Sequence, residues 1–189
     1  MIRIGILGGI GSGKSYSAKQ FGYPVFNADL EVQKLYKKSR KCYKKLQKAL
    51  PKYIFSFPIK KVEISRAVIA GSHNLIKIIK VIHPEVRLRM YDFLKKNKNK
   101  KVVILDIPLL LENKINRKND ILVFVDAKKK EINKRLKRRK NFTSKIFQKL
   151  KKLQLPVEIK KKKSDYIIKN NFNNYLLKKN VKRVLRKIL

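Results

Sequence analysis

The chain has 189 residues, 43% of them hydrophobic, and its 51 Lys and Arg against 12 Asp and Glu give a formal net charge of +39. This length suits one globular domain with a single core, with room for a lid or an insert. A single cysteine, Cys42, excludes a disulfide framework and a thiolate metal site, and two histidines disfavour structural zinc.

The N-terminal half predicts short strands and amphipathic helices. An apolar run at 2–7 predicts a buried strand, a helix follows it, and a second short strand comes next. A lysine-rich helical pattern leads to a break bounded by prolines, and apolar residues at three- and four-residue spacing then predict two further helices. The expected helices are 14–21, 29–50, 62–69 and 74–94, with the second strand at 23–26 and the break at 51–58. Pro84 should end a helix near His83, because the residue before a proline disfavours the helical conformation.

The C-terminal half repeats the alternation. Continuous β-branched runs at 101–110 and 120–127 are typical of central parallel strands. Residues 131–154 are helical in pattern with a turn near Asn141, and 165–170 and 175–189 predict a last strand and a closing helix. Strands that alternate with helices predict an α/β fold, a three-layer doubly wound sandwich with a mostly parallel five-stranded sheet.

The glycine-rich turn after the first strand carries the strongest motif. Gly8, Gly13, Lys14 and Ser15 fit G-x-x-x-x-G-K-[ST], with the required strand before it and helix after it. Glycines let successive N–H groups point inward around an anion, the Lys reaches the β- and γ-phosphates, and the Ser hydroxyl can ligate Mg²⁺. The alternative is a glycine-rich turn without a ligand. The residues expected to hold ATP here are Gly8, Gly9, Gly11, Ser12, Gly13, Lys14, Ser15 and Tyr16.

Other P-loop classes fit less well. The nearest text to a guanine-reading N-K-x-D motif is "NRKND" at 116–120, which precedes a strand instead of following one. ATPases of the AAA type carry an acidic pair at the end of the Walker B strand, whereas Asp106 is followed by Ile107. A small kinase of the nucleotide-kinase type remains, in which an acid beyond the second strand faces the acceptor hydroxyl. Asp29 is an acid that follows the second predicted strand.

Six segments in order resemble the dephospho-coenzyme A kinase family over essentially the whole chain. They are "LGGIGSGKS" near the start, "NAD" at 27–29, "HPEV" at 83–86, "DIPLLLEN" at 106–113, "RLKRR" at 135–139 and "SDYIIKNN" at 164–171. The resemblance implies transfer of the γ-phosphoryl group of ATP to the ribose 3′-hydroxyl of dephospho-CoA, with Mg²⁺. It also implies one P-loop kinase domain (1–189), with a core of about 1–29 and 100–189, a helical acceptor-binding subdomain of about 30–99 and a lid of about 135–163.

The resemblance further assigns catalytic roles. Asp29 matches the catalytic base, although an Asp at a helix start is also a common N-cap. Lys14 and Arg139 would stabilise the transferring phosphate, and Arg135, four residues before Arg139, would be a second lid arginine on the same helical face. Two positions depart from the family: Asn27 replaces an acid, and Tyr16 replaces a small hydroxyl residue, so α-phosphate binding there falls to main-chain amides.

The remaining candidates each have a second interpretation. Asp106 either holds Mg²⁺ together with Ser15 or has no metal role. Pro108, Leu109, Leu110 and Glu112 would shape the acceptor pocket, although Glu112 could instead cap a helix. Arg66 and His83 lie in the acceptor-binding segment, where Arg66 either pairs with the substrate pyrophosphate or is solvated, and His83 either touches substrate or is an ordinary buried histidine. Asn170 matches a position near the adenine, or is a turn residue.

The net charge and the lack of a targeting segment limit the partners and the location that the sequence predicts. The excess of Lys either attracts polyanions or reflects compositional drift, and its spread over nearly the whole chain favours drift. The glycine-broken N-terminal run does not resemble a signal peptide, and no stretch approaches ~18 apolar residues. We expect a cytoplasmic monomer with dephospho-CoA as substrate and without a specific nucleic acid or membrane partner. The rival interpretations are another small P-loop kinase, acting on a nucleoside, nucleotide or small alcohol, and a basic nucleic-acid-binding protein.

Overall fold

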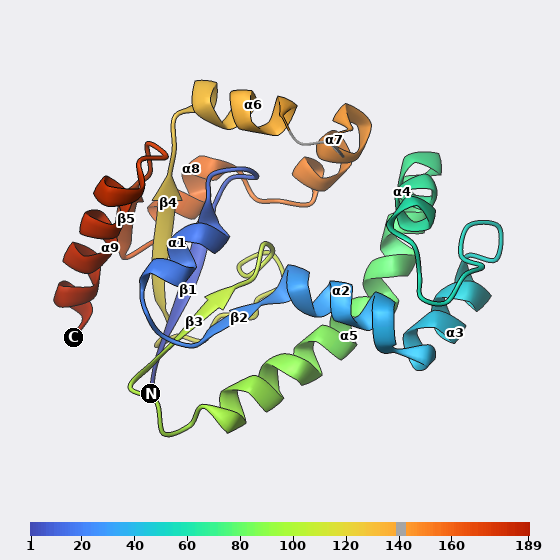
Figure 1. Ribbon diagram of the computed structural model, residues 1–189, viewed down its shortest axis with the longest axis horizontal. Helices are drawn as coiled ribbons and strands as arrows, with labels where there is room; N and C mark the ends of the chain where they lie inside the picture. Colours follow the sequence, from blue (N-terminus) through green and yellow to red (C-terminus); the bar gives the residue numbers. More distant parts are fainter. Residues whose placement is uncertain (139–142) are drawn as a thin grey trace. The chain divides into compact units, whose positions relative to one another are not determined.

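The computed structural model describes residues 1–138 and 143–189 (Figure 1). Contacts within the chain separate it into two compact units. The sheet unit is the described part of 1–27, 97–142 and 150–189, and the helical unit is 28–96 with 143–149. Each unit is considered by itself below.

A five-stranded parallel sheet forms the first unit. Its strands lie in the order β2-β3-β1-β4-β5, and each neighbouring pair is parallel. The bounds are β1 (Ile2–Gly8), β2 (Val25–Asn27), β3 (Val102–Asp106), β4 (Ile121–Asp126) and β5 (Tyr166–Lys169). The predicted α/β class and the five-stranded parallel sheet are confirmed. Because parallel strands end at the same edge, the loops after β1, β2 and β3 meet there.

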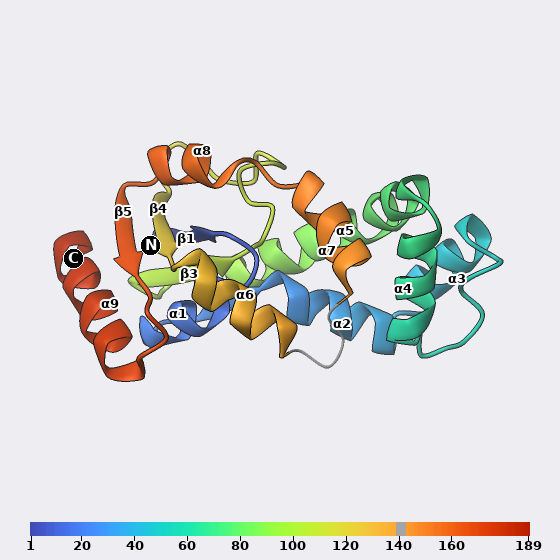
Figure 2. The ribbon, with the colours of Figure 1, turned by 90° about the horizontal axis from the view of Figure 1, so that it is seen from above.

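The central strand β1 has two covered faces. Ile4 and Ile6 are fully buried in a core cluster with Val181 of α9 (Asn174–Ile188) and with residues of α1 (Lys14–Gln20). The opposite face holds Gly5, where an added Cβ would come within 2.4 Å of Leu110. Figure 2 shows α1 and α8 (Val157–Lys162) on opposite sides of the sheet.

Two details of the sheet unit differ from the sequence-based expectation. The strand expected over 101–110 ends at Asp106, and 107–114 form turns. Leu110 is fully buried against Gly5. The apolar residues after Asp106 therefore reflect burial and not an extended backbone. The short helix α8 was not anticipated, because its sequence "VEIKKK" is too short and too basic to give a periodic apolar pattern.

Asp120, the last residue of the segment compared with a guanine-reading motif, has a structural role. Its carboxylate accepts a hydrogen bond from Arg3 Nη2 at 2.9 Å in a buried ion pair and a second one from the main chain of Arg117 at 2.9 Å. Burial raises the pKa of Asp120, and its bonds to Arg117 and Arg3 act in the opposite direction. This carboxylate therefore ties β1 to the start of β4.

Four helices make up most of the second unit. They are α2 (Ala28–Lys38), α3 (Arg40–Ala49), α4 (Lys61–Ala70) and α5 (Ser72–Lys96). The single helical pattern expected over 29–50 is interrupted at Ser39, which has an extended backbone and whose hydroxyl caps α3 by accepting from Cys42 N at 3.2 Å. A serine with this geometry starts a new helix because it satisfies an otherwise unpaired amide.

The prediction that Pro84 ends a helix is wrong. Helix α5 runs through it for 25 residues. A proline removes one main-chain donor, but α5 packs against α2, α3 and α4 and buries apolar side chains on both sides of the proline, including Ile82 and Met90. Tertiary packing along the helix outweighs the local preference.

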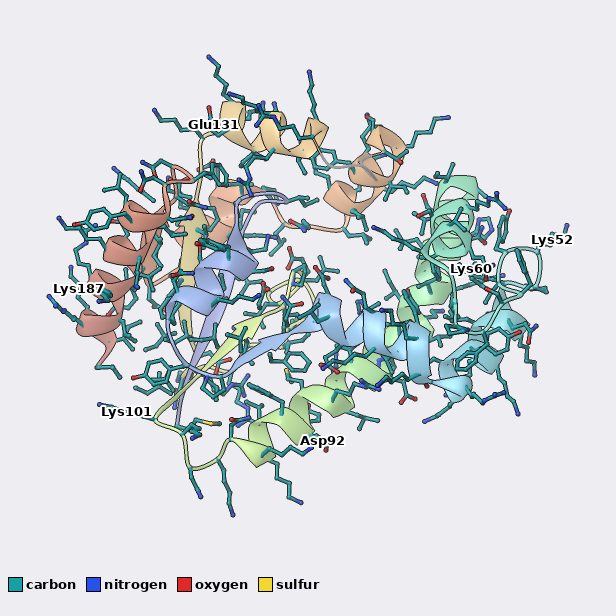
Figure 3. The ribbon with its side chains drawn as sticks, viewed as in Figure 1. Lys52, Lys60, Asp92, Lys101, Glu131 and Lys187 are labelled. Carbon is teal, nitrogen blue, oxygen red and sulfur yellow. The ribbon has the colours of Figure 1, made fainter. Side chains whose placement is uncertain are left out.

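Helices α6 (Lys129–Lys137) and α7 (Ser144–Lys152) lie before and after residues 139–142, which are outside the described part of the chain. The turn expected near Asn141 falls within those residues. Within the described chain, every helix is too short or too polar to cross a lipid bilayer. Lysines project from many elements, among them the exposed Lys52, Lys60, Lys101 and Lys187 (Figure 3).

Candidate active site

The glycine-rich loop connects β1 to α1 and has the conformation that its sequence requires. Gly13 has a left-handed backbone with φ of 90°, and it is the residue immediately before α1. A Cβ on Gly13 would come within 2.4 Å of Asn170 Nδ2, so only glycine fits. Gly8 and Gly11 also have positive φ values, of 149° and 84°. Such a turn at a helix start directs main-chain N–H groups toward an anion.

Lys14 lies across this loop. Its Nζ donates hydrogen bonds to Gly9 O at 2.8 Å and Gly8 O at 3.2 Å. The ammonium group is therefore held against the main chain of the loop at Gly8 and Gly9. Ser12 of the same loop is 1% exposed, and its hydroxyl has no hydrogen-bond partner within the described residues. Tyr16 is 45% exposed, on the first turn of α1.

Three side chains meet where β2 and β3 end. Asn27 and Asp106 are the last residues of these strands and are register partners, and the Asn27 side-chain amide donates to Asp106 Oδ2. Ser15 hydrogen bonds to the same carboxyl group. Burial raises the pKa of Asp106, and the bond to Ser15, the charge of Lys14 and the bond to Asn27 oppose that rise. The Asn27 side chain thus supplies a donor that orients the Asp106 carboxylate.

A hydroxyl group beside a buried carboxylate fits Mg²⁺, which takes oxygen ligands and keeps several of its waters. Within 1–138 and 143–189 no cluster of three or more His, Cys, Asp or Glu could form a closed protein cage for a metal. The donor set offered by Ser15 and Asp106 is therefore of the kind that completes its coordination with phosphate oxygens and water.

The far side of the loop is held by the segment that follows β5. Asn170 is 3% exposed, donates from Nδ2 to Ser12 O at 2.9 Å, and accepts from Phe172 N at 2.9 Å. Phe172, at φ of 63°, lies under the Arg135 guanidinium, whose carbon is 4.4 Å from the ring centroid. Sequence reasoning selected Arg135 and Asn170 but missed Phe172, because a lone aromatic residue in a loop belongs to no motif.

The turns after β3 carry the other candidates of the sheet unit. Pro108 and Leu109 are half-buried. Glu112 Oε1 accepts from Leu155 N at 2.9 Å and pairs with Lys160 Nζ at 2.8 Å, so this carboxylate is bound to the segment that enters α8. Sequence reasoning missed Lys160, since one lysine among 51 basic residues gives no signal.

The candidates of the helical unit lie on three helices. Asp29 is exposed in the first turn of α2, which begins at Ala28, so Asp29 is inside the helix and is not its N-cap. An acid in a first turn is stabilised by the helix dipole. Arg66 is exposed on α4. His83 is half-buried on α5, and burial together with the charge of Arg87 lowers its pKa.

Arg139, expected to act at the transferring phosphate, lies outside the described residues. Helix α6 ends at Lys137, so the expectation that Arg135 and Arg139 share a helical face stays a prediction. The described residues nonetheless bring together the P-loop, Ser15, Asp106 and Asn170 in one unit.

A phosphate-binding loop between a parallel strand and a helix, with a Lys, a Ser and a neighbouring buried Asp, defines a P-loop nucleotide-binding protein. Comparison with known proteins narrows this class. The family model described as dephospho-CoA kinase matches residues 2–175. A dephospho-CoA kinase of Wolbachia pipientis wMel is 32% identical over 187 residues, which cover 96% of this chain and 95% of that protein.

Solved structures agree in fold. The crystal structure of TT1252 from Thermus thermophilus matches with a TM-score of 0.79 and 26% identity, over 100% of this chain and 98% of that one. Dephospho-CoA kinase from Campylobacter jejuni matches with a TM-score of 0.66 and 19% identity, over 98% and 96%, which concerns the fold alone. The chain belongs to the dephospho-CoA kinase family.

Proposed function

We propose that this protein transfers the γ-phosphoryl group of ATP to the ribose 3′-hydroxyl of dephospho-CoA, which yields coenzyme A and ADP in the last step of coenzyme A synthesis. The observation that carries the proposal is the P-loop with Ser15 hydrogen bonded to Asp106, in a chain of this family. We expect it to act as a monomer in the cytoplasm, where its substrates would be found.

The nucleotide would be held from the sheet unit. The loop amides from Gly8 to Ser15 would bind the phosphates, and Lys14 would exchange Gly8 O and Gly9 O for β- and γ-phosphate oxygens. The adenine of ATP would lie beside Arg135 and Phe172, which already form a stacked pair. Asn170 would hold the loop in the conformation that binds phosphate.

Ser15 and Asp106 would hold Mg²⁺, with Asn27 fixing the orientation of the carboxylate. The ion would neutralise charge on the β- and γ-phosphates. Because the pKa of Asp106 is raised by burial, the bonds from Ser15 and Asn27 and the charge of Lys14 all help to keep the group ionised.

The remaining candidate residues would act on the acceptor. Asp29 would accept the proton of the attacking hydroxyl, and it need not be a strong base because phosphoryl transfer rests mainly on positioning and charge stabilisation. Arg66 would pair with the pyrophosphate of dephospho-CoA, and His83, Pro108, Leu109 and Glu112 would contact the rest of it. Arg139 would stabilise the charge on the transferring group.

A direct assay tests the proposal. The purified protein is incubated with ATP, Mg²⁺ and dephospho-CoA, and coenzyme A is identified by mass and by its 3′-phosphate. Nucleosides, nucleotides and shikimate in parallel reactions test the rival acceptors. Phosphorylation of dephospho-CoA at a rate far above the other acceptors is expected. Turnover of a nucleoside or small alcohol without turnover of dephospho-CoA would refute the proposed substrate.

A further inference from the structure

One lysine of this very basic chain is removed from solvent. Lys160, on α8, is 1% exposed, and among the described residues only Arg3 shares this burial as a basic side chain. A buried ammonium group is costly unless it is paired, and it therefore marks a place where the fold needs a fixed positive charge.

The partners of Lys160 are specific. Its Nζ lies 2.8 Å from Glu112 Oε1 and donates to Gln154 Oε1 at 3.0 Å. The same Glu112 oxygen accepts from Leu155 N at 2.9 Å. One carboxylate oxygen is thus bound by two donors, and its orientation is fixed.

The second oxygen of Glu112 is different. The Glu112 side chain is 10% exposed, and its Oε2 is buried without a hydrogen-bond partner within the described residues. A buried carboxylate oxygen without a donor is destabilising, and such an atom in a native structure needs an explanation. One explanation is that a bound ligand supplies the missing donor.

The location of Glu112 favours that explanation. It lies in the turns after β3, four residues beyond Pro108, and these turns are anchored on the sheet because Leu110 packs against Gly5. Val157, the first residue of α8, lies near the P-loop, where a Cβ on Gly9 would be 3.7 Å from it. Lys160 therefore connects the proposed acceptor wall to the helix that abuts the phosphate loop.

We infer that Lys160 is a positioning residue of the acceptor site: its buried ammonium fixes Oε1 of Glu112, so that Oε2 accepts a hydrogen bond from an O–H or N–H group of the acceptor. The inference rests on the proposed function and deepens it. Lys160 touches no reacting atom and acts through Glu112 alone. A purely structural ion pair is the alternative.

Lys160→Met tests this inference, since it removes the ammonium and keeps an unbranched side chain of similar length. The Michaelis constant for dephospho-CoA should rise about tenfold or more, as for other losses of a supporting group, while that for ATP stays within about twofold. Lys161→Met is the matched control. Lys161 is the next residue of α8 and pairs with Asp126 at 3.0 Å, but its side chain is 39% exposed, and its loss should change neither constant.

Glu112→Gln supplies the second variant, and it keeps the test decisive if Lys160→Met does not fold. It should also raise the Michaelis constant for dephospho-CoA alone, and the double variant should be no worse than the more impaired single variant, because both act through one carboxylate. Additive losses, an unchanged constant for dephospho-CoA, or equal losses for ATP and dephospho-CoA with a lowered melting temperature would each overturn the inference. Wild-type protein that does not phosphorylate dephospho-CoA would overturn the proposed function and the inference together, whereas an active wild type with indifferent variants would overturn the inference alone.

Discussion

The two units of this molecule present their candidate residues in opposite ways. In the sheet unit, Asn170 is buried and bonded to Ser12 O, and Asp106 is buried and bonded to Asn27. In the helical unit, Asp29 and Arg66 are exposed on helices. The proposed nucleotide site is therefore built in advance by tertiary contacts, while the proposed acceptor residues Asp29 and Arg66 are exposed to solvent.

This difference has a physical basis. A triphosphate is recognised by main-chain amides, and main chain keeps a strained turn only when neighbouring groups hold it, as Asn170 holds the turn at Gly13. The proposed acceptor is long and flexible, and an exposed charged side chain such as Arg66 would recognise it. Substitution of a residue that holds the P-loop should therefore affect stability and ATP binding together, whereas substitution of Asp29 should lower turnover and leave ATP binding unchanged.

The largest effect is expected for Asp29→Asn. Loss of the proposed base should lower kcat by about 10²- to 10⁴-fold, while the dissociation constant of ATP, measured by calorimetry, stays the same. Asp92→Asn is a matched control, since Asp92 is an exposed acid of the same unit and projects away from α5 (Figure 3). Retention of kcat in Asp29→Asn would remove Asp29 from the role of base.

Asn170→Ala should weaken the P-loop, which tertiary contacts hold in place. It leaves Ser12 O and Phe172 N without their partner, which should cost about 1–3 kcal/mol of folding free energy and weaken ATP binding by about tenfold. Thermal unfolding and ATP titration measure the two effects. Asn171→Ala is the control, because Asn171 is exposed and its side chain bonds only locally, to Asn173 N. Equal behaviour of the two variants would contradict the role given to Asn170.

Phe172→Leu should have a smaller effect. It removes the ring beneath Arg135 and with it a cation–π contact of about 0.5–1 kcal/mol, so the dissociation constant of ATP should rise about two- to fivefold. Phe172→Tyr keeps the ring and should bind ATP as the wild type does. If both variants weaken ATP binding equally, the side chain acts by its shape and not through Arg135.

The same contrast explains what could be predicted from the sequence. The P-loop and the sheet were predictable because they depend on local order: glycines at fixed spacing, and β-branched runs that mark buried parallel strands. Phe172 and Lys160 were not predictable, because their positions depend on contacts with Arg135 and Glu112 that are distant in the sequence.

Local rules also failed where packing along a whole helix decided the outcome. The sequence around Pro84 predicts a helix end, yet α5 continues, since a missing hydrogen bond at one residue is offset by apolar burial on either side. The proposed role of Asp29 rests on the family resemblance, because an acid after a strand is equally compatible with a helix start.

The smallest effect is expected at His83, which is half-buried, whereas the other candidates of the helical unit, Asp29 and Arg66, are exposed. Burial and the charge of Arg87 lower its pKa in the folded protein, so the unfolded chain binds the proton more readily. Stability should therefore fall as the pH drops below the ordinary histidine value of about 6.5. His83→Gln cannot titrate, so its unfolding free energy should decline less between pH 7 and pH 5 than that of the wild type, and subtracting the two curves cancels the other titrating groups. Parallel curves would mean that His83 is as well solvated as Arg66, and the two units would then differ even more than the structure indicates.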